Sequence, residues 1–150
     1  MTQIPAELKT VLDDFSAITD RSERTEYLIE LADRFNEVKV PASIATKPYP
    51  EDHRVPHCES DAYIWADDQP DGSVKFYFDV LNPQGLSAMA ISVILDETLS
   101  GKPLEQVAAV TPEIVLTIFG QSVSMGKGQG LMGIVGMAQR EALLRLGREK

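Results

Sequence analysis

The residues best suited to chemistry lie in one short stretch of the chain, from Val55 to Asp61. It holds the only cysteine, Cys58, directly after one of the two histidines. A thiolate is both a nucleophile and a metal ligand, so this stretch predicts nucleophilic sulfur chemistry or a metal site. The alternative is a buried cysteine that acts only as a small hydrophobic side chain. A reactive, accessible thiol is favoured by the polar neighbours of Cys58, which are His57, Glu59, Ser60 and Asp61.

The residue types around Cys58 argue against a metal site and against a cysteine protease. His53, His57 and Cys58 could bind a metal together with Glu51 or Asp52, but structural zinc sites normally combine several cysteines and histidines at close spacing. A cysteine protease needs a histidine and an asparagine from distant parts of the sequence, whereas both histidines here are sequence neighbours of Cys58. We therefore expect no metal and no cofactor.

Two glycine patterns near the C-terminus resemble nucleotide-binding motifs but lack essential parts of them. Residues 128–133 fit G-x-G-x-x-G, yet a predicted helix precedes them and too few residues follow to complete a βαβ unit. The segment Gly126-Lys127-Gly128 lacks the first glycine of a P-loop and the Ser or Thr that follows the P-loop lysine. We expect residues 121–129 to form a glycine-rich loop before a last helix.

The overall composition disfavours several classes of protein. The 150 residues carry a formal net charge of −9, which argues against nucleic-acid binding because phosphates are bound by clustered Lys and Arg. The same charge favours a basic protein partner. No apolar run is long enough to cross a membrane, and the first residues do not form a signal peptide. We expect one domain over residues 1–150, located in the cytoplasm, without nucleic-acid or membrane contacts.

The first forty residues predict two amphipathic helices joined by a short loop. Apolar residues at helical spacing fill residues 8–15, directly after Pro5, which suits the start of a helix. A second apolar stripe covers residues 27–35, with Asp20 as the expected N-cap and Glu23 as its capping-box partner. The short connection predicts that the two helices form an antiparallel pair.

The middle of the chain predicts a long loop followed by a β-hairpin. Four prolines between residues 41 and 56 exclude a helix there and predict an extended loop that leads to Cys58. Strand formers fill residues 62–65 and 74–80, and a turn signal separates them. Because two strands alone are marginally stable, part of the 43–57 loop is expected to add a third. The side chains expected to face the helices are Val74, Phe76 and Phe78.

The second half of the chain predicts further helices. Asn82-Pro83 resembles the N-cap and first residue of a long helix that ends near Leu99. Short helices should start at Pro103 and at Thr111-Pro112, and a last helix near Gly130. Helices, hairpin and helices in this order predict an α+β fold, in which a small antiparallel sheet packs against N- and C-terminal helices.

Around Cys58 the sequence resembles a known family. The segment V-x-H-C-x-S-x-A-Y at residues 55–63 is similar to the V-x-G-C-x-S-x-V-W segment of SufE-type proteins, the Fe–S metabolism-associated domain. The resemblance extends from about Pro5 to Leu146. It includes L-I-E-L-A in the second helix, L-S-G-K-P-L-E-Q-V after the long helix, and G-Q-G-L-M near the start of the last helix.

The resemblance implies a persulfide relay in which Cys58 carries the sulfur. In this family a pyridoxal-phosphate cysteine desulfurase (SufS-like) forms a persulfide on its own cysteine. The family's cysteine attacks the terminal sulfur and carries it towards Fe–S cluster assembly, which regenerates and so activates the desulfurase. The implied partners are this desulfurase and a downstream Fe–S assembly scaffold. The chain itself is expected to be a monomer or a weak dimer.

Several residues around the expected site depart from the family pattern. His57 stands where the family usually has Gly, and Glu59 stands where it has Gln. Lys127 matches an Arg of the family, which keeps the charge and loses the bidentate geometry. With Ser60, these residues are the expected surroundings of sulfur transfer. The acidic neighbours oppose a thiolate, so we expect positive groups on the docked partner to activate Cys58.

Two other functions compete with sulfur relay. An Fe–S scaffold needs several thiolate ligands, and a chain with one cysteine can supply them only through oligomers. A plain interaction module with an incidental cysteine needs no reactive thiol at all. Rapid alkylation of Cys58 in native buffer is expected for the relay, and protection until unfolding is expected for the buried alternative.

Overall fold

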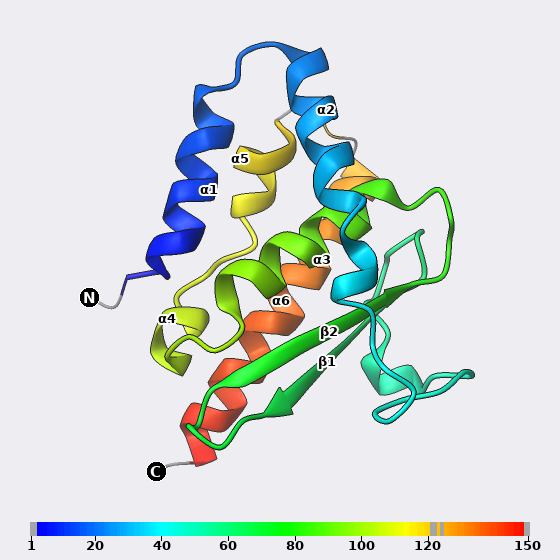
Figure 1. Cartoon of the computed structure of the whole chain (residues 1–150), viewed down its shortest axis with the longest axis vertical. Helices are drawn as coiled ribbons and strands as arrows, with labels where there is room; N and C mark the ends of the chain where they lie inside the picture. Colours follow the sequence, from blue (N-terminus) through cyan, green and yellow to red (C-terminus); the bar gives the residue numbers. More distant parts are fainter. Residues whose placement is uncertain (1–2, 121–122, 124, 149–150) are drawn as a thin grey trace.

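The computed structural model describes residues 3–120, 123 and 125–148. The chain folds into helices around a β-hairpin, which confirms the predicted α+β class (Figure 1). In chain order the elements are α1 (Ala6–Ala17), α2 (Arg21–Ala32), the 3-10 helices η1 (Phe35–Glu37) and η2 (Glu51–His53), β1 (Ala62–Asp68), β2 (Val74–Val80), α3 (Leu86–Leu99), α4 (Leu104–Ala108), α5 (Ile114–Phe119) and α6 (Met125–Arg148). None of the helices in the described ranges is long and apolar enough to cross a membrane.

The sheet consists of β1 and β2, which pair antiparallel from Ala62 opposite Val80 to Asp68 opposite Val74. The expected third strand does not form in the 43–57 loop, which the structure describes in full. Two isolated bridges take its place, one between Lys39 and Phe78 and one between Arg54 and Tyr63. The physical reason is the proline content of the loop, because proline cannot donate to a ladder.

One face of the hairpin carries the main hydrophobic core. Here α3 packs on β2 and α6 packs on β1, and in Figure 1 α3 runs alongside β2 while α6 passes behind α3. The side chains of Val74, Phe76 and Phe78 are at most 1% exposed and belong to this core, which confirms their predicted orientation. The alternation of these residues therefore identified the correct face of β2.

The opposite face of the hairpin is covered by the proline-containing loop. A second apolar cluster forms there, and its members are Val40, Ala45, Tyr49, Tyr63, Trp65 and Tyr77. The Tyr49 hydroxyl donates a 2.6 Å hydrogen bond to the buried carboxylate of Asp79, which also accepts from the backbone N–H of Val80. The loop is thus an ordered cover that fixes the chain on its way to Cys58.

The variant Tyr49→Phe is expected to lower the free energy of unfolding by about 1–3 kcal/mol at neutral pH, because the buried Asp79 carboxylate loses a donor. Burial of Tyr49 and its bond to Asp79 raise the pKa of this phenol above its ordinary value of 10.0. The contribution of Tyr49 is therefore complete below about pH 10 and is lost as the pH rises further. Urea midpoints check both parts: the variant should have the lower midpoint at neutral pH, and the difference should shrink above about pH 10. Equal midpoints at neutral pH, or a difference that does not shrink at alkaline pH, would contradict the prediction.

The N-terminal helices are antiparallel, as predicted (Figure 1), and they touch where the ring of Phe15 on α1 stacks on the ring of Tyr27 on α2, with centroids 4.6 Å apart. The short helix α5 packs against α1 beside this pair. The side chain of Arg24 on α2 joins all three helices. Its guanidinium donates to the carbonyls of Phe15 and Ile18 at the end of α1 and to those of Thr117 and Ile118 at the end of α5. The predicted N-cap of α2 is confirmed, since the Asp20 carboxylate accepts from the backbone N–H of Ser22.

Two helix starts differ from the sequence prediction. The long helix α3 begins at Leu86, because the Asn82 side chain accepts from the backbone N–H of Gln84 and closes a turn before the helix. The last helix begins at Met125, so most of the expected 121–129 loop is helical; residues 121, 122 and 124 lie outside the described part. Residues 128–133 are inside α6, which rules out a dinucleotide-binding turn there.

Candidate functional site

The candidate site is the loop from Val55 to Asp61, between η2 and β1. Backbone hydrogen bonds tie this loop to the open end of the hairpin. Val55 N–H donates to the Ala62 carbonyl at 2.8 Å, Leu81 N–H donates to the Asp61 carbonyl at 3.1 Å, and Asn82 N–H donates to the Ser60 carbonyl at 3.2 Å. The start of β1 and the end of β2 therefore hold Cys58 at a fixed place beside the helices.

Two residues with positive φ bracket Cys58 in this loop. His57 has a φ of 60° and Asp61 has a φ of 51°. The left-handed region is unfavourable for side chains with a Cβ, although Asp tolerates it better than most. This backbone geometry explains why glycine suits position 57 and shows that His57 occupies it with strain.

The variant His57→Gly is expected to raise the free energy of unfolding by at most about 1 kcal/mol. Relief of the left-handed strain contributes about 1–2 kcal/mol, and the greater entropy of glycine in the unfolded chain offsets about 0.5–1 kcal/mol of it. The variant His57→Val should lower the free energy by about 1–2 kcal/mol, because a β-branched residue is least compatible with positive φ. Urea unfolding of both variants checks the order, and a valine variant as stable as the glycine variant would contradict it.

Glycines of α6 let this helix approach the Cys58 loop closely. A Cβ on Gly130 would lie 3.0 Å from the Cα of Cys58 and 3.2 Å from the carbonyl oxygen of His57. A Cβ on Gly133 would lie 3.0 Å from the Val55 side chain. The glycine pattern that resembled a nucleotide-binding motif thus serves close packing of a helix against a loop.

Close packing buries the thiol. Cys58 is 9% exposed and belongs to the main hydrophobic core, so the expectation of an accessible thiol is wrong for this structure. Two hollows nevertheless meet at Cys58. An inner cavity of about 50 Å³ lies towards α3 and α6, and an open cleft of about 390 Å³ lies on the other side, towards Arg54 and Gln129. Cys58 therefore lies just below the surface, largely shielded from solvent.

The predicted neighbours of Cys58 do gather around it. The exposed side chain of His57 lines the outer cleft, and half-buried Ser60 lines the inner cavity. Glu59 borders both hollows, and Lys127, on the first turn of α6, lines the inner cavity. The structure thus brings together residues that are about 70 positions apart in sequence.

An ion pair closes the outer side of the loop. The guanidinium of Arg54 lies 2.8 Å from the Asp61 carboxylate, and the hydrogen bond between them raises the pKa of Arg54. Both side chains are more than 40% exposed, so the pair contributes little to stability. The pair holds the guanidinium of Arg54 beside Asp61, where Arg54 lines the outer cleft.

The first turn of α3 and the two residues before it supply site residues that the sequence did not predict. Gln84, Gly85, Ser87 and Ala88 line the inner cavity opposite Lys127. Gly85 is needed for close approach, because a Cβ there would lie 2.8 Å from the Val80 side chain and 2.9 Å from Ser60. The only local signal was the turn sequence N-P-Q-G at residues 82–85, which was interpreted as the start of the long helix.

His53 lies apart from this site. Its ring stacks on Trp65 with centroids 5.2 Å apart, and its Nδ1 atom makes a 2.9 Å hydrogen bond with the Ile64 carbonyl. It therefore belongs to the cover on the outer face of the hairpin. Among the described residues, His, Cys, Asp and Glu side chains form no group of three or more that could hold a metal ion.

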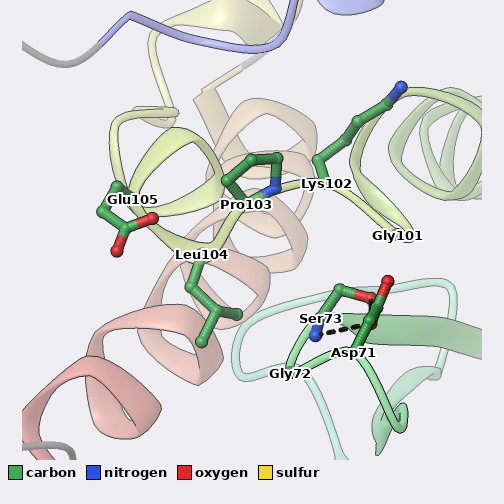
Figure 2. A pocket seen from close by; sticks show the side chains of 8 residues that line it. All are labelled: Asp71, Gly72, Ser73, Gly101, Lys102, Pro103, Leu104 and Glu105. Atoms are coloured by element: carbon green, nitrogen blue, oxygen red, sulfur yellow. Dashed lines mark hydrogen bonds between the residues drawn. The ribbon is translucent and has the colours of Figure 1, made fainter.

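A separate pocket of about 340 Å³ lies at the turn of the hairpin, at the opposite end from Cys58. Figure 2 shows it between the turn and the connection from α3 to α4, with Lys102 pointing away from Asp71. Two of its charged groups, Asp71 and Lys102, already have partners. Asp71 accepts from the N–H and hydroxyl of Ser73, and Lys102 forms an ion pair with Glu7. We assign this pocket no function.

Comparisons with known proteins agree with the fold and identify the family. The chain is similar to the solution structure of a hypothetical protein from Thermus thermophilus, with a TM-score of 0.72 and 24% sequence identity over 97% of this chain and 99% of the other. This likeness shows a shared fold only. None of the curated proteins matches the chain. A family model described as the Fe–S metabolism associated domain, SufE, matches residues 9–142. This match spans nearly the whole chain, which therefore belongs to the SufE family and is associated with Fe–S metabolism.

Proposed function

We propose that this chain is a sulfur acceptor, which takes a persulfide sulfur from a cysteine desulfurase onto Cys58 and relays it to Fe–S cluster assembly. The observation that carries the proposal is the position of the only thiol. Cys58 lies between an open cleft, through which a donor can approach, and a small inner cavity, into which an added sulfur atom can fit. Membership of the SufE family supplies the link to Fe–S metabolism.

The proposed transfer is a thiol–persulfide exchange that needs no external oxidant or reductant. The Cys58 thiolate attacks the terminal sulfur of the donor's Cys–S–SH group. A new S–S bond forms on Cys58 while the S–S bond of the donor breaks, and the donor cysteine leaves as a thiolate. The proton on the terminal sulfur stays with it. The products are a Cys58 persulfide and a regenerated desulfurase, which accounts for activation of the donor.

The inner cavity suits a stored persulfide. A cavity needs only about 10–15 Å³ to hold one water molecule. The cavity of about 50 Å³ beside Cys58 therefore has room for one more sulfur atom. Burial between α3 and α6 would shield that sulfur from small thiols in solution. Cys58 must still move towards the outer cleft when a donor arrives, because the residue is only 9% exposed at rest.

The surface charge supports a protein partner with basic groups. The formal net charge of the chain is −9, and Glu51, Asp52 and Glu59 are exposed near Cys58 in the sequence, with Glu59 bordering both hollows at the cysteine. Positive groups on a docked desulfurase would complement these carboxylates and stabilise the Cys58 thiolate at the moment of attack. The acceptor after Cys58 is proposed to be a cluster-assembly scaffold, and the compartment the cytoplasm.

The decisive measurement is the turnover of L-cysteine by the cysteine desulfurase of the same organism, with and without this protein. Wild-type protein is expected to stimulate turnover, while Cys58→Ser should give none, because a hydroxyl cannot accept the sulfane sulfur at neutral pH. Mass spectrometry should show one added sulfur atom on Cys58 of the wild-type protein. Equal stimulation by wild type and Cys58→Ser would overturn the proposal.

The burial of Cys58 is also what an incidental cysteine would show, so alkylation must be measured in two states. For a relay, the free protein should react slowly and the desulfurase-bound protein rapidly. For a plain interaction module, Cys58 should stay protected in both states until unfolding. An Fe–S scaffold stays less favourable, because a chain with one cysteine provides only one thiolate for a cluster.

A further inference from the structure

A second groove lies next to the Cys58 site, between α2 and the start of α3. It has a volume of about 280 Å³, and its apolar wall consists of Leu28, Ile29 and Leu86. Ile29 is 43% exposed and Leu86 is 48% exposed, while Leu28 packs partly against the core. Large aliphatic side chains that are exposed on facing helices form a ready contact for another apolar group.

This groove continues into the inner cavity at Cys58. Gln84, Ser87 and Lys127 line both hollows, so the two share one wall along the first turns of α3 and α6. The outer cleft in turn shares Glu59 and Gly126 with the inner cavity. An extended segment with its reactive cysteine at Cys58 can therefore place a neighbouring side chain between Ile29 and Leu86.

Carboxylates stand around the margin of the groove, while a cation, Lys127, lines the groove itself. Glu26 and Glu30 are exposed on α2, one helical turn before and directly after Ile29, and Glu59 lies at the other end, beside Cys58. An apolar floor with acidic margins complements an aliphatic or aromatic side chain that has Lys or Arg close by. A second copy of this chain fits less well, since each copy carries a net charge of −9.

We infer that this apolar groove docks the persulfide donor, by holding an aliphatic or aromatic side chain that lies near the donor's cysteine and is flanked by basic residues. The inference rests on the proposed function, because it takes the donor to be a cysteine desulfurase. It adds a contact that positions the donor before any sulfur is transferred. Docking and sulfur acceptance are thus separate properties, with separate residues.

The test measures the Kd between the cysteine desulfurase and chains in the Cys58→Ser background, where no sulfur can be transferred. Ile29→Asp and Leu86→Asp should each raise the Kd by at least about tenfold (about 1.4 kcal/mol), because each replaces a buried aliphatic contact at the interface with a carboxylate. Leu143→Asp is the matched control, because Leu143 is 52% exposed near the far end of α6. Its Kd should be unchanged. Ile29→Ala, which adds no charge, should show a smaller loss of the same sign.

Charge reversal tests the basic part of the inferred partner. Glu26→Lys and Glu30→Lys together should slow association severalfold at low salt, and the difference from wild type should shrink as salt is raised. Groove variants with the Kd of the Leu143→Asp control would overturn the inference. Concentration-dependent dimerisation that Ile29→Asp abolishes would also overturn it, in favour of a second copy in the groove.

Failure of the proposed function has a different signature. If Cys58→Ser still stimulates the desulfurase as wild type does, the relay is wrong, while the Kd comparison still decides whether the groove docks that enzyme. If wild type stimulates and Cys58→Ser does not, but the groove variants bind normally, the relay stands and the groove is not its docking site. Circular dichroism and thermal unfolding of each variant confirm that these surface changes leave the fold intact.

Discussion

The variant Gly130→Ala is expected to raise the alkylation rate of Cys58 by about ten- to a hundredfold. The added Cβ would lie 3.0 Å from the Cα of Cys58, 3.2 Å from the His57 carbonyl oxygen and 3.3 Å from the Cβ of Cys58. Two of these atoms are backbone, so they cannot rotate away as the end of a side chain can. Overpacking of this kind costs about 1–3 kcal/mol. Here the cost lowers the free energy that holds the Cys58 loop against α6, so the loop opens more often and exposes the thiol.

The matched control for this prediction is Gly136→Ala, on the same helix. A Cβ on Gly136 would lie 3.9 Å from the Pro112 side chain, which is an ordinary contact. Alanine in place of glycine should stabilise α6 there by about 0.5–1 kcal/mol and leave Cys58 protected. The measurements are the rate of native-state alkylation, followed by mass spectrometry, and the thermal unfolding midpoint. Equal alkylation rates in the two variants would show that α6 does not hold the loop closed.

The sequence predicted most of the elements of the fold because their signals are local. Helical periodicity, the N-cap Asp20, the hairpin turn and the alternation in residues 74–80 each depend on near neighbours. The packing of α5 against α1 could not be predicted in this way. An apolar stripe shows that a helix face will be covered, and it does not show which helix covers it. The prediction of a third strand was wrong for a similar reason. The outer face of the hairpin is buried, but an irregular loop covers it instead of a strand.

Which residues surround Cys58 could be predicted in part from the sequence, but the burial of Cys58 could not. The polar neighbours of Cys58 in sequence suggested exposure, while its burial is imposed by Gly130 on α6 and by the start of α3. The early start of α6 was missed because Gly126, Gly128 and Gly130 each lower helix propensity by about 1 kcal/mol. Tertiary contacts with the Cys58 loop outweigh this cost, and the lack of a side chain at Gly130 makes the closest of those contacts possible.

The arginine that joins the N-terminal helices should be the most important polar side chain for stability. The variant Arg24→Met is expected to lower the free energy of unfolding by about 2–4 kcal/mol. It removes four hydrogen bonds, of 2.7–3.1 Å, to carbonyls at the ends of α1 and α5, together with a cation–π contact to Phe15 at 5.8 Å. A hydrogen bond to a charged group contributes about 1.5–3 kcal/mol, and water replaces part of it at this half-buried site.

The matched control is Arg34→Met, because Arg34 also makes two hydrogen bonds but lies on the surface. Its guanidinium pairs with Glu97, and the two side chains are 43% and 44% exposed. Such an exposed pair is worth about 0–1 kcal/mol, so the urea midpoint should move little. If Arg24→Met and Arg34→Met shift the midpoint equally, with unchanged slope, the ends of α1 and α5 find other donors. A much larger shift for Arg24→Met would show that one side chain on α2 holds the ends of both α1 and α5 in place.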